Sequence, residues 1–525
     1  MALFERRSSM EAFDQWRGQS PTGSERRKLS FNPIADYVPP RAEEETVPAF
    51  EVSATKRMVQ VAIAVVYCLL AAGPVFGFAA LKPVLVQQGV YQYLCTGDEL
   101  EHGVCYGQEV RLNLMFTLAA VSTNLCALPV GTILDRYGPR IASLVGTFFL
   151  ALGAMSMAFA QDLPFDAYIP GYLFLAIGGP FVFIPAFQLS NTFSKYSGSI
   201  LALLTGAFDT SSAVFLVYRL LYQGSDGSFT PKKFFLIYLV VPAAILLAQI
   251  FVMPSQSYKS VGELVTEETE TNATETTTLL GSKAGDDQNK QGKQHAQTSG
   301  VYGALHGRTA AQQILTPWFI LIALFTVLQM LRINYFVATI RTQYTALLHD
   351  SKAASQINDV FDVALPLGGV IAIPFIGLVL DHTSTPFVLL LLVVIATAIG
   401  AFGIIAQQWA AYANIALFVV YRPLYYTAVS DYSAKVFGFA TFGKVYGLII
   451  CLAGICNLAQ AGLDALTHTT FHDDPVPVNV VLLSTALAVG IAMVGYVWRK
   501  SMTLNRDQLE EEAEESPETN MPTLS

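Results

Sequence analysis

Twelve long apolar runs divide this chain, and each has the length of a membrane-spanning helix, about 20 residues. A lipid core offers no hydrogen bonds to the backbone, so such runs must form helices that satisfy their own N–H and C=O groups. The chain is 53% hydrophobic and only 14% charged, against ~25% charged in soluble proteins. We therefore predict an all-α membrane protein with twelve transmembrane helices. The predicted spans are 58–86, 110–134, 141–160, 167–189, 199–222, 234–253, 314–338, 357–380, 386–406, 409–430, 438–463 and 478–498.

A polar segment separates the first six spans from the last six. Residues 254–313 are rich in Thr, Glu, Gln, Gly and Lys, a composition that cannot bury enough apolar area to offset the entropy of ordering. We expect a flexible loop here between two six-helix lobes, 58–253 and 314–498. The first 57 residues lack an early apolar core, so they predict a disordered tail and no cleaved secretory signal. Residues 499–525 predict a disordered acidic tail.

Lysine and arginine predict the orientation, because cytosolic loops carry an excess of both. The loop at 87–109 contains neither, whereas Lys232 and Lys233 go against the rule. Basic residues next to spans on the other side are Lys56, Arg57, Arg136, Arg140, Lys195, Arg499 and Lys500. Both termini and the central loop are therefore expected in the cytosol.

Cys95 and Cys105 lie close together in the 87–109 loop. Outside the cytosol they can form a disulfide, and the alternative is a pair of free thiols. No Cys/His spacing resembles a zinc site, so no metal or other cofactor is expected. No basic patch indicates nucleic-acid binding, and no nucleophile–base set indicates an enzyme.

A short polar turn links the second and third spans and is repeated once. It reads Gly131-Thr-Ile-Leu-Asp135-Arg136-Tyr137-Gly138-Pro139-Arg140, and a shorter copy, Gly377-Leu-Val-Leu-Asp381-His382, follows the eighth span. Gly131 allows close helix contact, and Asp135 can face a helix N-terminus, which favours negative charge by ~0.3–1 kcal/mol. Arg136 and Arg140 can pair with carboxylates of the other lobe. The turn predicts a conformational latch, with a simple tight turn as the alternative.

Twelve spans, the division into six and six, and this turn resemble the major facilitator superfamily. The resemblance implies two lobes that rock about a central site and give it alternating access. The second copy of the turn departs from the pattern, because it lacks the later glycine and arginine.

A closer resemblance is to solute carrier family 43, the system-L-type amino acid transporters, and their fungal relatives. The segments that carry it are Gly73 to Gly77, 88–95, Gln108, 111–117, 128–140, 330–336 and 442–447. It implies facilitated, sodium-independent transport of large neutral amino acids. One branch of that family resembles nucleobase carriers, so a nucleobase or other small organic solute remains an alternative. A second alternative is a non-transporting nutrient sensor with the same fold.

Ionisable side chains at membrane depth cost ~2.5–3.5 kcal/mol and mark candidate sites. Three lie in mid-span: Asp209, Arg332 and Arg422. Arg332 can bind the carboxylate of an amino acid with its planar fork, while Asn334 and Tyr335 add polar contacts. The alternative for Arg332 is a structural bridge to Asp209 or Asp362. Arg422 and Asp209 are further candidates, with a structural role as the alternative for Arg422.

The interrupted run from Gly73 to Gly77 can unwind and offer backbone groups to a substrate, as broken helices do in other carriers. Close helix packing is the alternative for both glycines. Phe76, Phe78 and Tyr425 can line a pocket for an apolar side chain or serve in packing alone. The substrate-binding candidates are Gly73, Phe76, Gly77, Asp209, Arg332, Asn334, Tyr335, Arg422 and Tyr425.

Glu275 to Leu280 resembles an acidic dileucine sorting signal, with Leu279 and Leu280 contacting a sorting adaptor. Such a signal favours an endosomal or vacuolar membrane over the plasma membrane, and chance occurrence is the alternative. The expected partners are otherwise the lipid bilayer and a small-molecule substrate, and the protein is expected to be a monomer.

Overall fold

The computed structural model describes residues 52–95, 106–193, 196–256, 258 and 301–515. The chain divides into two units, Met1–Glu45 and Thr46–Ser525, and every described residue belongs to the second. The predicted sorting signal at Leu279 and Leu280, and also Cys105, lie outside the described residues.

Helices make up the regular structure of the described residues, and a first set of them precedes the central segment. In chain order this N-terminal set consists of α2 (Ala54–Ala71), η3 (Pro74–Gly77), α3 (Phe78–Gln87), η4 (Gln92–Leu94), α4 (Tyr106–Leu125), α5 (Ala127–Ala158), α6 (Tyr168–Ala186), η6 (Phe187–Thr192), α7 (Ser197–Thr210), α8 (Ala213–Gly224), α9 (Pro231–Tyr238) and α10 (Val240–Phe251).

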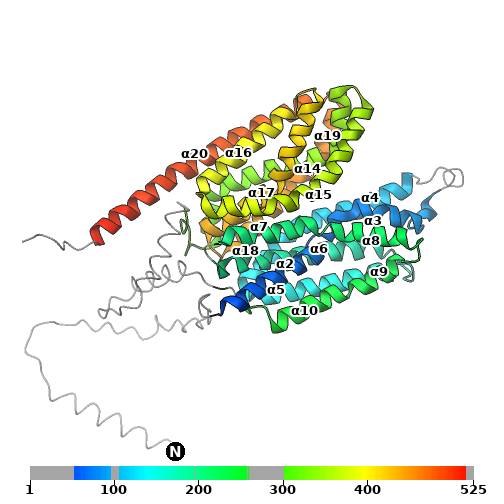
Figure 1. Ribbon diagram of the computed structural model, residues 1–525, viewed down its shortest axis with the longest axis horizontal. Helices are drawn as coiled ribbons and strands as arrows, with labels where there is room; N and C mark the ends of the chain where they lie inside the picture. Colours follow the sequence, from blue (N-terminus) through cyan, green and yellow to red (C-terminus); the bar gives the residue numbers. More distant parts are fainter. Residues whose placement is uncertain (1–51, 96–105, 194–195, 257, 259–300, 516–525) are drawn as a thin grey trace, which may run out of the picture. The chain divides into compact units, whose positions relative to one another are not determined.

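A second set follows the central segment (Figure 1). This C-terminal set consists of α13 (Ala310–Ile314), α14 (Pro317–Leu348), α15 (Ser351–His382), α16 (Thr385–Phe402), α17 (Gln408–Phe437), α18 (Phe442–Asn457), α19 (Ala459–Thr469) and α20 (Val476–Glu515).

Nine helices of the described residues are long and apolar enough to cross a membrane, or ten if the bent pair Ser351–Leu365 and Leu367–His382 forms one span. One of them, Gly107–Ala158, has 52 residues and would extend about 78 Å, enough to cross a bilayer core twice. Gly138, with φ 81° and ψ 171°, divides it. The predicted count of twelve requires that this stretch cross twice and that the 30-residue α17 cross as well.

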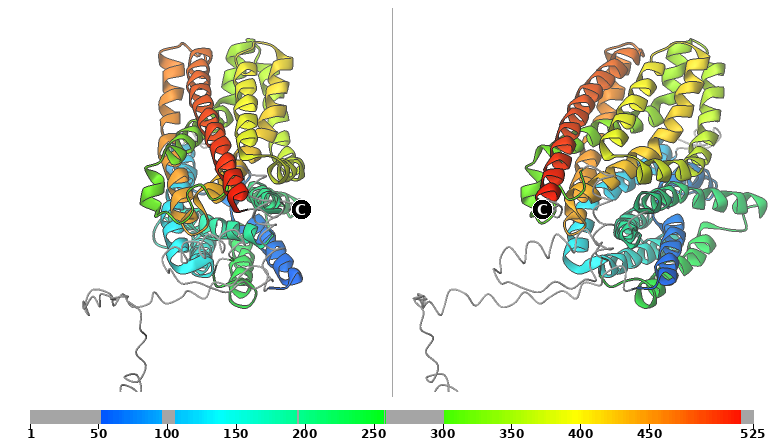
Figure 2. Two further views of the ribbon diagram at one scale, coloured as in Figure 1. Left: turned by 90° about the vertical axis from the view of Figure 1, so that its left-hand side faces the viewer. Right: turned by 60° about the vertical axis from the view of Figure 1, so that its left-hand side comes forward.

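Several predicted spans are not single straight helices. The first contains the short 3₁₀ helix η3 between α2 and α3, and the fifth, sixth and eleventh are each divided into two helices. The eighth bends by 49°. The last helix, α20, continues to Glu515, so the first part of the expected disordered tail is helical (Figure 2).

Glycines let α5 and α6 approach closely in the centre of the N-terminal set. Gly146 and Gly153 face Gly178 and Gly171 at matching seven-residue spacings. A Cβ on Gly178 would lie 2.9 Å from the Leu150 backbone nitrogen, and one on Gly153 would lie 2.8 Å from the Gly171 carbonyl oxygen. Membrane helices rely on such contacts because lipid provides no hydrophobic force between them.

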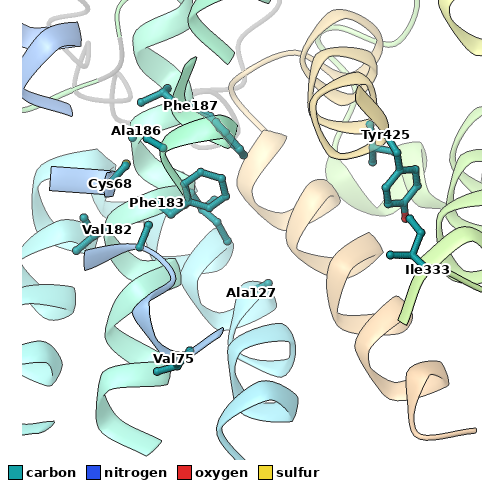
Figure 3. Packing of buried hydrophobic residues seen from close by; sticks show 14 of the residues in the cluster. Cys68, Val75, Ala127, Val182, Phe183, Ala186, Phe187, Ile333 and Tyr425 are labelled. Atoms are coloured by element: carbon teal, nitrogen blue, oxygen red, sulfur yellow. The ribbon is translucent and has the colours of Figure 1, made fainter. Parts of the chain in front are cut away.

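The two sets meet along a seam formed by five helices. In the seam α5 packs against α18, and α7 packs against α15 and α17. Aromatic rings reinforce it: Phe187 lies 5.7 Å from Tyr446 between ring centroids and 6.0 Å from Phe442. Figure 3 shows Phe183 and Phe187 in the buried core, with Tyr425 and Ile333 side by side in the C-terminal set.

Candidate functional site

An ion pair joins the two sets of helices, between the C-terminal end of α7 and the middle of α17. Arg422 on α17 places Nη2 3.7 Å from Oδ1 of Asp209 on α7. Both side chains are largely buried, at 24% and 12% exposed. At 3.7 Å the contact is ionic and too long for a hydrogen bond. Neither Asp209 Oδ1 nor Arg422 Nε has a hydrogen-bond partner, so both ions retain unused bonding capacity.

Aromatic rings lie next to this pair. Phe208 directly precedes Asp209, and its ring contacts Phe76 of η3 and Phe183 of α6 at centroid distances of 5.7 Å and 4.6 Å. Tyr426 follows Arg422 by about one helical turn along α17. Aromatic residues are therefore neighbours of both ions along the chain.

The predicted break in the first span lies against the same turn of α7. Helix α2 ends at Ala71, and Gly73 leaves the helical region with φ −144° and ψ 30°. Its N–H donates to Ser211 Oγ at 2.7 Å, while the Tyr172 hydroxyl donates to the Val75 carbonyl at 2.6 Å. These backbone groups are thus satisfied by the protein itself. At Gly77 a Cβ would lie 2.1 Å from the Ser212 carbonyl oxygen, which requires close packing.

Arg332 lies elsewhere, near the middle of α14 and within the C-terminal set. Its Nη1 donates to Gln329 Oε1 at 3.2 Å and its Nη2 to the Ala396 carbonyl at 3.0 Å. The predicted alternative of a bridge to Asp209 is wrong, because Asp209 contacts Arg422. Nothing is described for the side chain of Asp362.

The other C-terminal candidates hold helices together within their own set. Asn334 Nδ2 donates to Asn457 Oδ1 at 3.1 Å, at the break between α18 and α19. The Tyr335 hydroxyl lies 2.8 Å from Thr467 Oγ1 on α19. The Tyr425 hydroxyl donates to the Thr326 carbonyl on α14 at 2.7 Å. The structure therefore does not bring Asn334, Tyr335 and Tyr425 together with the Arg422–Asp209 pair.

The polar turn at Asp135 closes one side of the seam. Asp135 Oδ1 accepts from the N–H of Gly443, and Oδ2 from the N–H of Lys444, both at 2.8 Å. These residues begin α18, whose own N-cap residue, Thr441, makes no capping hydrogen bond. Gly131 makes the approach possible, because a Cβ there would lie 1.8 Å from the Gly443 carbonyl oxygen. We call this contact the first clasp.

The second copy of the turn makes an equivalent contact, with the roles of the two sets of helices reversed. Asp381 on α15 accepts from the N–H of Gly198 at 2.8 Å and from the N–H and hydroxyl of Ser199 at 3.2 Å and 2.5 Å. Gly198 and Ser199 begin α7, whose N-cap side chain likewise makes no capping bond. A Cβ on Gly377 would lie 2.8 Å from Ser199 Cα. In this second clasp the C-terminal set caps a helix of the N-terminal set.

The arginines of the first turn do not make the expected contacts with carboxylates of the other lobe. Arg140 Nη2 donates to the Met253 carbonyl at 2.7 Å, beyond the end of α10, where cations are favoured. Arg136 is exposed and lies over the ring of Tyr137. Gly138, at φ 81°, also lies close to Ser255, whose carbonyl oxygen would be 2.9 Å from a Cβ.

The described cysteines differ in state. Cys95 is disulfide-bonded, whereas Cys68, Cys126, Cys451 and Cys456 are free. Since Cys105 is not described, its pairing with Cys95 stays a prediction. In the described part of the chain no group of His, Cys, Asp or Glu side chains could hold a metal ion.

The sequence did not predict the contact partners of Asp209 and Asp135. Ser211 and Phe208 lie within two residues of Asp209 in the chain, and this proximity was the only sequence feature that could have suggested their part in the site. Gly443 and Lys444 belong to a segment already noted for its resemblance, but nothing in the sequence indicated that Asp135 would bind them.

No family model matches the chain, but individual proteins do. The chain is 44% identical over 479 residues to Protein FMP42 of Saccharomyces cerevisiae, which covers 84% of this chain and 95% of that protein. The chain belongs to the FMP42 family.

Other relatives of the family are more distant. The Bos taurus protein named equilibrative nucleobase transporter 1 is 25% identical over 465 residues, 80% of this chain and 91% of that protein. A Toxoplasma gondii protein named aromatic and large neutral amino acid transporter 5-3 is 26% identical over 243 residues, 45% of this chain and 48% of that protein.

A solved structure gives the fold. The major facilitator superfamily proton:xylose symporter XylE, bound to 6-bromo-6-deoxy-D-glucose, matches with a TM-score of 0.55 over 85% of this chain and 96% of that chain, at 13% identity. The predicted all-α major facilitator fold is thereby confirmed, and the chain is an integral multi-pass membrane protein with that fold.

Proposed function

We propose that this protein is a facilitative transporter of neutral amino acids, branched-chain or aromatic, that works by alternating access. The observation that carries the proposal is the Arg422–Asp209 ion pair between α17 and α7. A carrier that rocks about a central site needs binding groups on both of its moving parts. This pair provides one group on each.

The chemistry of the pair complements an amino acid zwitterion. Arg422 can bind the substrate carboxylate through two N–H groups, and Asp209 can accept from the substrate ammonium. Substrate entry would then replace the 3.7 Å contact between the two ions with hydrogen bonds from each ion to the substrate. Asp209 Oδ1 and Arg422 Nε, which have no hydrogen-bond partner among the described residues, are available for these bonds. An apolar substrate side chain fits the adjacent rings of Phe76 and Phe208.

The names of the relatives support transport but divide over the substrate. The Toxoplasma gondii relative is named for aromatic and large neutral amino acids, whereas the bovine relative, which matches more of the chain, is named for nucleobases. A nucleobase or another small organic solute is therefore the alternative. Because a neutral nucleobase makes no demand for paired charges, the ion pair favours the amino acid.

Uptake of radiolabelled leucine and phenylalanine into proteoliposomes containing the full chain tests this proposal. Removing one ion alone would leave the other buried and unpaired, at a cost of about 3–5 kcal/mol. We therefore choose the neutral double variant Asp209→Asn/Arg422→Gln, which keeps the shape of both side chains. It should fold, and it should lose at least ~90% of amino acid uptake because both charged contacts are gone.

The matched control is another ion pair, Arg111–Asp166, which lies within the N-terminal set at 3.4 Å. The variant Arg111→Gln/Asp166→Asn should retain uptake.

Uptake measured with and without a pH gradient distinguishes uniport from proton-coupled transport. Uptake of adenine or hypoxanthine but not of leucine would assign the alternative substrate, and no uptake of any solute would favour a sensor.

The two clasps are proposed to act as a conformational latch that holds one face of the transporter closed. Each adds two or more hydrogen bonds to a carboxylate and a favourable charge at a helix N-terminus. The distribution of Lys and Arg supports a cytosolic location for this face and for both termini. The plasma membrane and the vacuolar or endosomal membrane remain the candidate locations.

A further inference from the structure

A polar cavity lies inside the C-terminal set, apart from the Arg422–Asp209 pair. Helices α14, α16, α17 and α20 enclose it, and its water-accessible volume is about 50 Å³. The lining residues with polar side chains are Gln329, Arg332, Tyr335, Gln343, Asn414, Tyr421 and Asn479. Of the five seam helices only α17 contributes described lining residues, namely Asn414, Phe418 and Tyr421, and neither Arg422 nor Asp209 is among the lining residues.

Arg332 brings a full positive charge to this cavity, and no carboxylate of the described side chains forms a salt bridge with it. Among the described residues its hydrogen bonds go to the neutral Gln329 side chain and the Ala396 carbonyl, and it takes part in no salt bridge. A guanidinium has five N–H donors, so several remain for a ligand. An uncompensated charge at membrane depth is costly, and a bound anion would remove that cost.

Two further side chains of the lining have unused hydrogen-bonding atoms. The Tyr421 hydroxyl has no partner although the residue is only 2% exposed, and Asn414, at 1% exposed, has a partnerless Oδ1. The Asn414 amide nitrogen donates to the Tyr344 hydroxyl at 3.0 Å. A flipped amide would accept from Tyr344 instead and turn its NH₂ group toward the cavity. Tyr421 and Asn414 can thus donate to an anion together with Arg332.

The size of the cavity selects the class of anion. A water molecule requires about 10–15 Å³ of this volume, so 50 Å³ has room for a small ion with a few waters and not for leucine. We propose that this cavity binds a small monovalent anion, such as chloride, as a structural counter-ion of Arg332. The site is separate from the one proposed for the amino acid.

Thermal unfolding of the purified full chain in lipid nanodiscs tests this without any amino acid or transport. The chain is heated in sodium gluconate, and the gluconate is replaced stepwise by chloride, bromide or formate at constant ionic strength. Since a ligand that binds only the folded state stabilises it, the midpoint should rise and saturate with chloride and bromide. A response to formate alone would identify a small carboxylate as the ligand. Gluconate is too large for the cavity.

Two variants and a control connect the response to the cavity. Arg332→Gln should weaken the apparent anion affinity at least ~tenfold, because the charge is lost. Asn414→Asp places a fixed carboxylate in the cavity, so this variant should fold and be insensitive to chloride. Arg341→Gln, at an exposed position of the same helix, should respond like the unaltered chain.

The proposal is overturned if the midpoint of the unaltered chain is the same in gluconate, chloride, bromide and formate, which would mean that the cavity holds only water. It is equally overturned if Asn414→Asp keeps the full anion response, and this holds even if Arg332→Gln does not fold. Failure of amino acid uptake would leave these outcomes unaffected.

Discussion

At the scale of single residues, glycine decides how closely the two sets of helices approach. Gly131 and Gly443 contact each other through their backbones, and a side chain on either would enter the other's main chain. A Cβ on Gly443 would also lie 2.4 Å from Asp135 Oδ1. The first clasp therefore requires glycine at both positions as well as the carboxylate of Asp135.

The variant Gly131→Ala should lower the thermal unfolding midpoint of the purified protein. Glycine-to-alanine changes in a helix interior normally stabilise by up to about 1 kcal/mol, but here the backbone of α18 must move away. Gly495→Ala in α20, where nothing lies within 4 Å of the new Cβ, is the matched control and should leave the midpoint unchanged or raise it. Equal effects of the two substitutions would argue against the contact.

At the scale of helices, the protein breaks its spans where polar side chains can satisfy the freed backbone. The break after α2 is held by Ser211 on the neighbouring α7, which accepts from the Gly73 N–H. The Tyr238 hydroxyl of α9 donates to the Leu70 carbonyl at 2.9 Å. Membrane helices tolerate irregular backbone only under such conditions.

Replacing Ser211 with alanine should therefore destabilise the protein by about 1–3 kcal/mol, since a buried N–H would lose its partner. Ser212→Ala provides the comparison, because its hydroxyl donates only to the carbonyl of Asp209 in the same stretch of chain, at 2.9 Å. Thermal unfolding in the same lipid would measure both. A midpoint lower for Ser212→Ala than for Ser211→Ala would contradict this account of the break.

At the scale of the whole described unit, each of the two sets of helices caps one helix of the other set. An aspartate of the N-terminal set caps α18, and an aspartate of the C-terminal set caps α7. Each capped helix begins with backbone donors that its own N-cap side chain leaves free. Opening this face would expose both sets of donors, so the clasps favour the closed arrangement.

The double variant Asp135→Asn/Asp381→Asn should open that face more often. A cysteine at Ala127, a buried seam position against Gly447, would report it through labelling by a membrane-impermeant maleimide in a background without Cys126 and Cys456. Loss of about 1 kcal/mol at each clasp predicts at least a ~fivefold faster labelling. An unchanged rate would exclude the latch, and the side from which the reagent acts would test the predicted orientation.

The sequence by itself indicated the all-α class and the approximate limits of most apolar helices, because each must match the thickness of a bilayer. It also indicated the break at Gly73, the two Gly-xxx-Asp turns and the three mid-span charges, because glycines and charges are rare enough in lipid to require a reason. The major facilitator fold was predicted from the same residues.

Only the tertiary structure decided which of these residues meet. Asp209 lies beside Arg422 rather than Arg332, and Arg140 binds the end of α10 rather than a carboxylate of the other set. Such pairings depend on how helices far apart in the chain are rotated and placed against one another. The periodicity of an apolar run contains little of that information, because a helix that faces lipid on one side and protein on the other is hydrophobic on both.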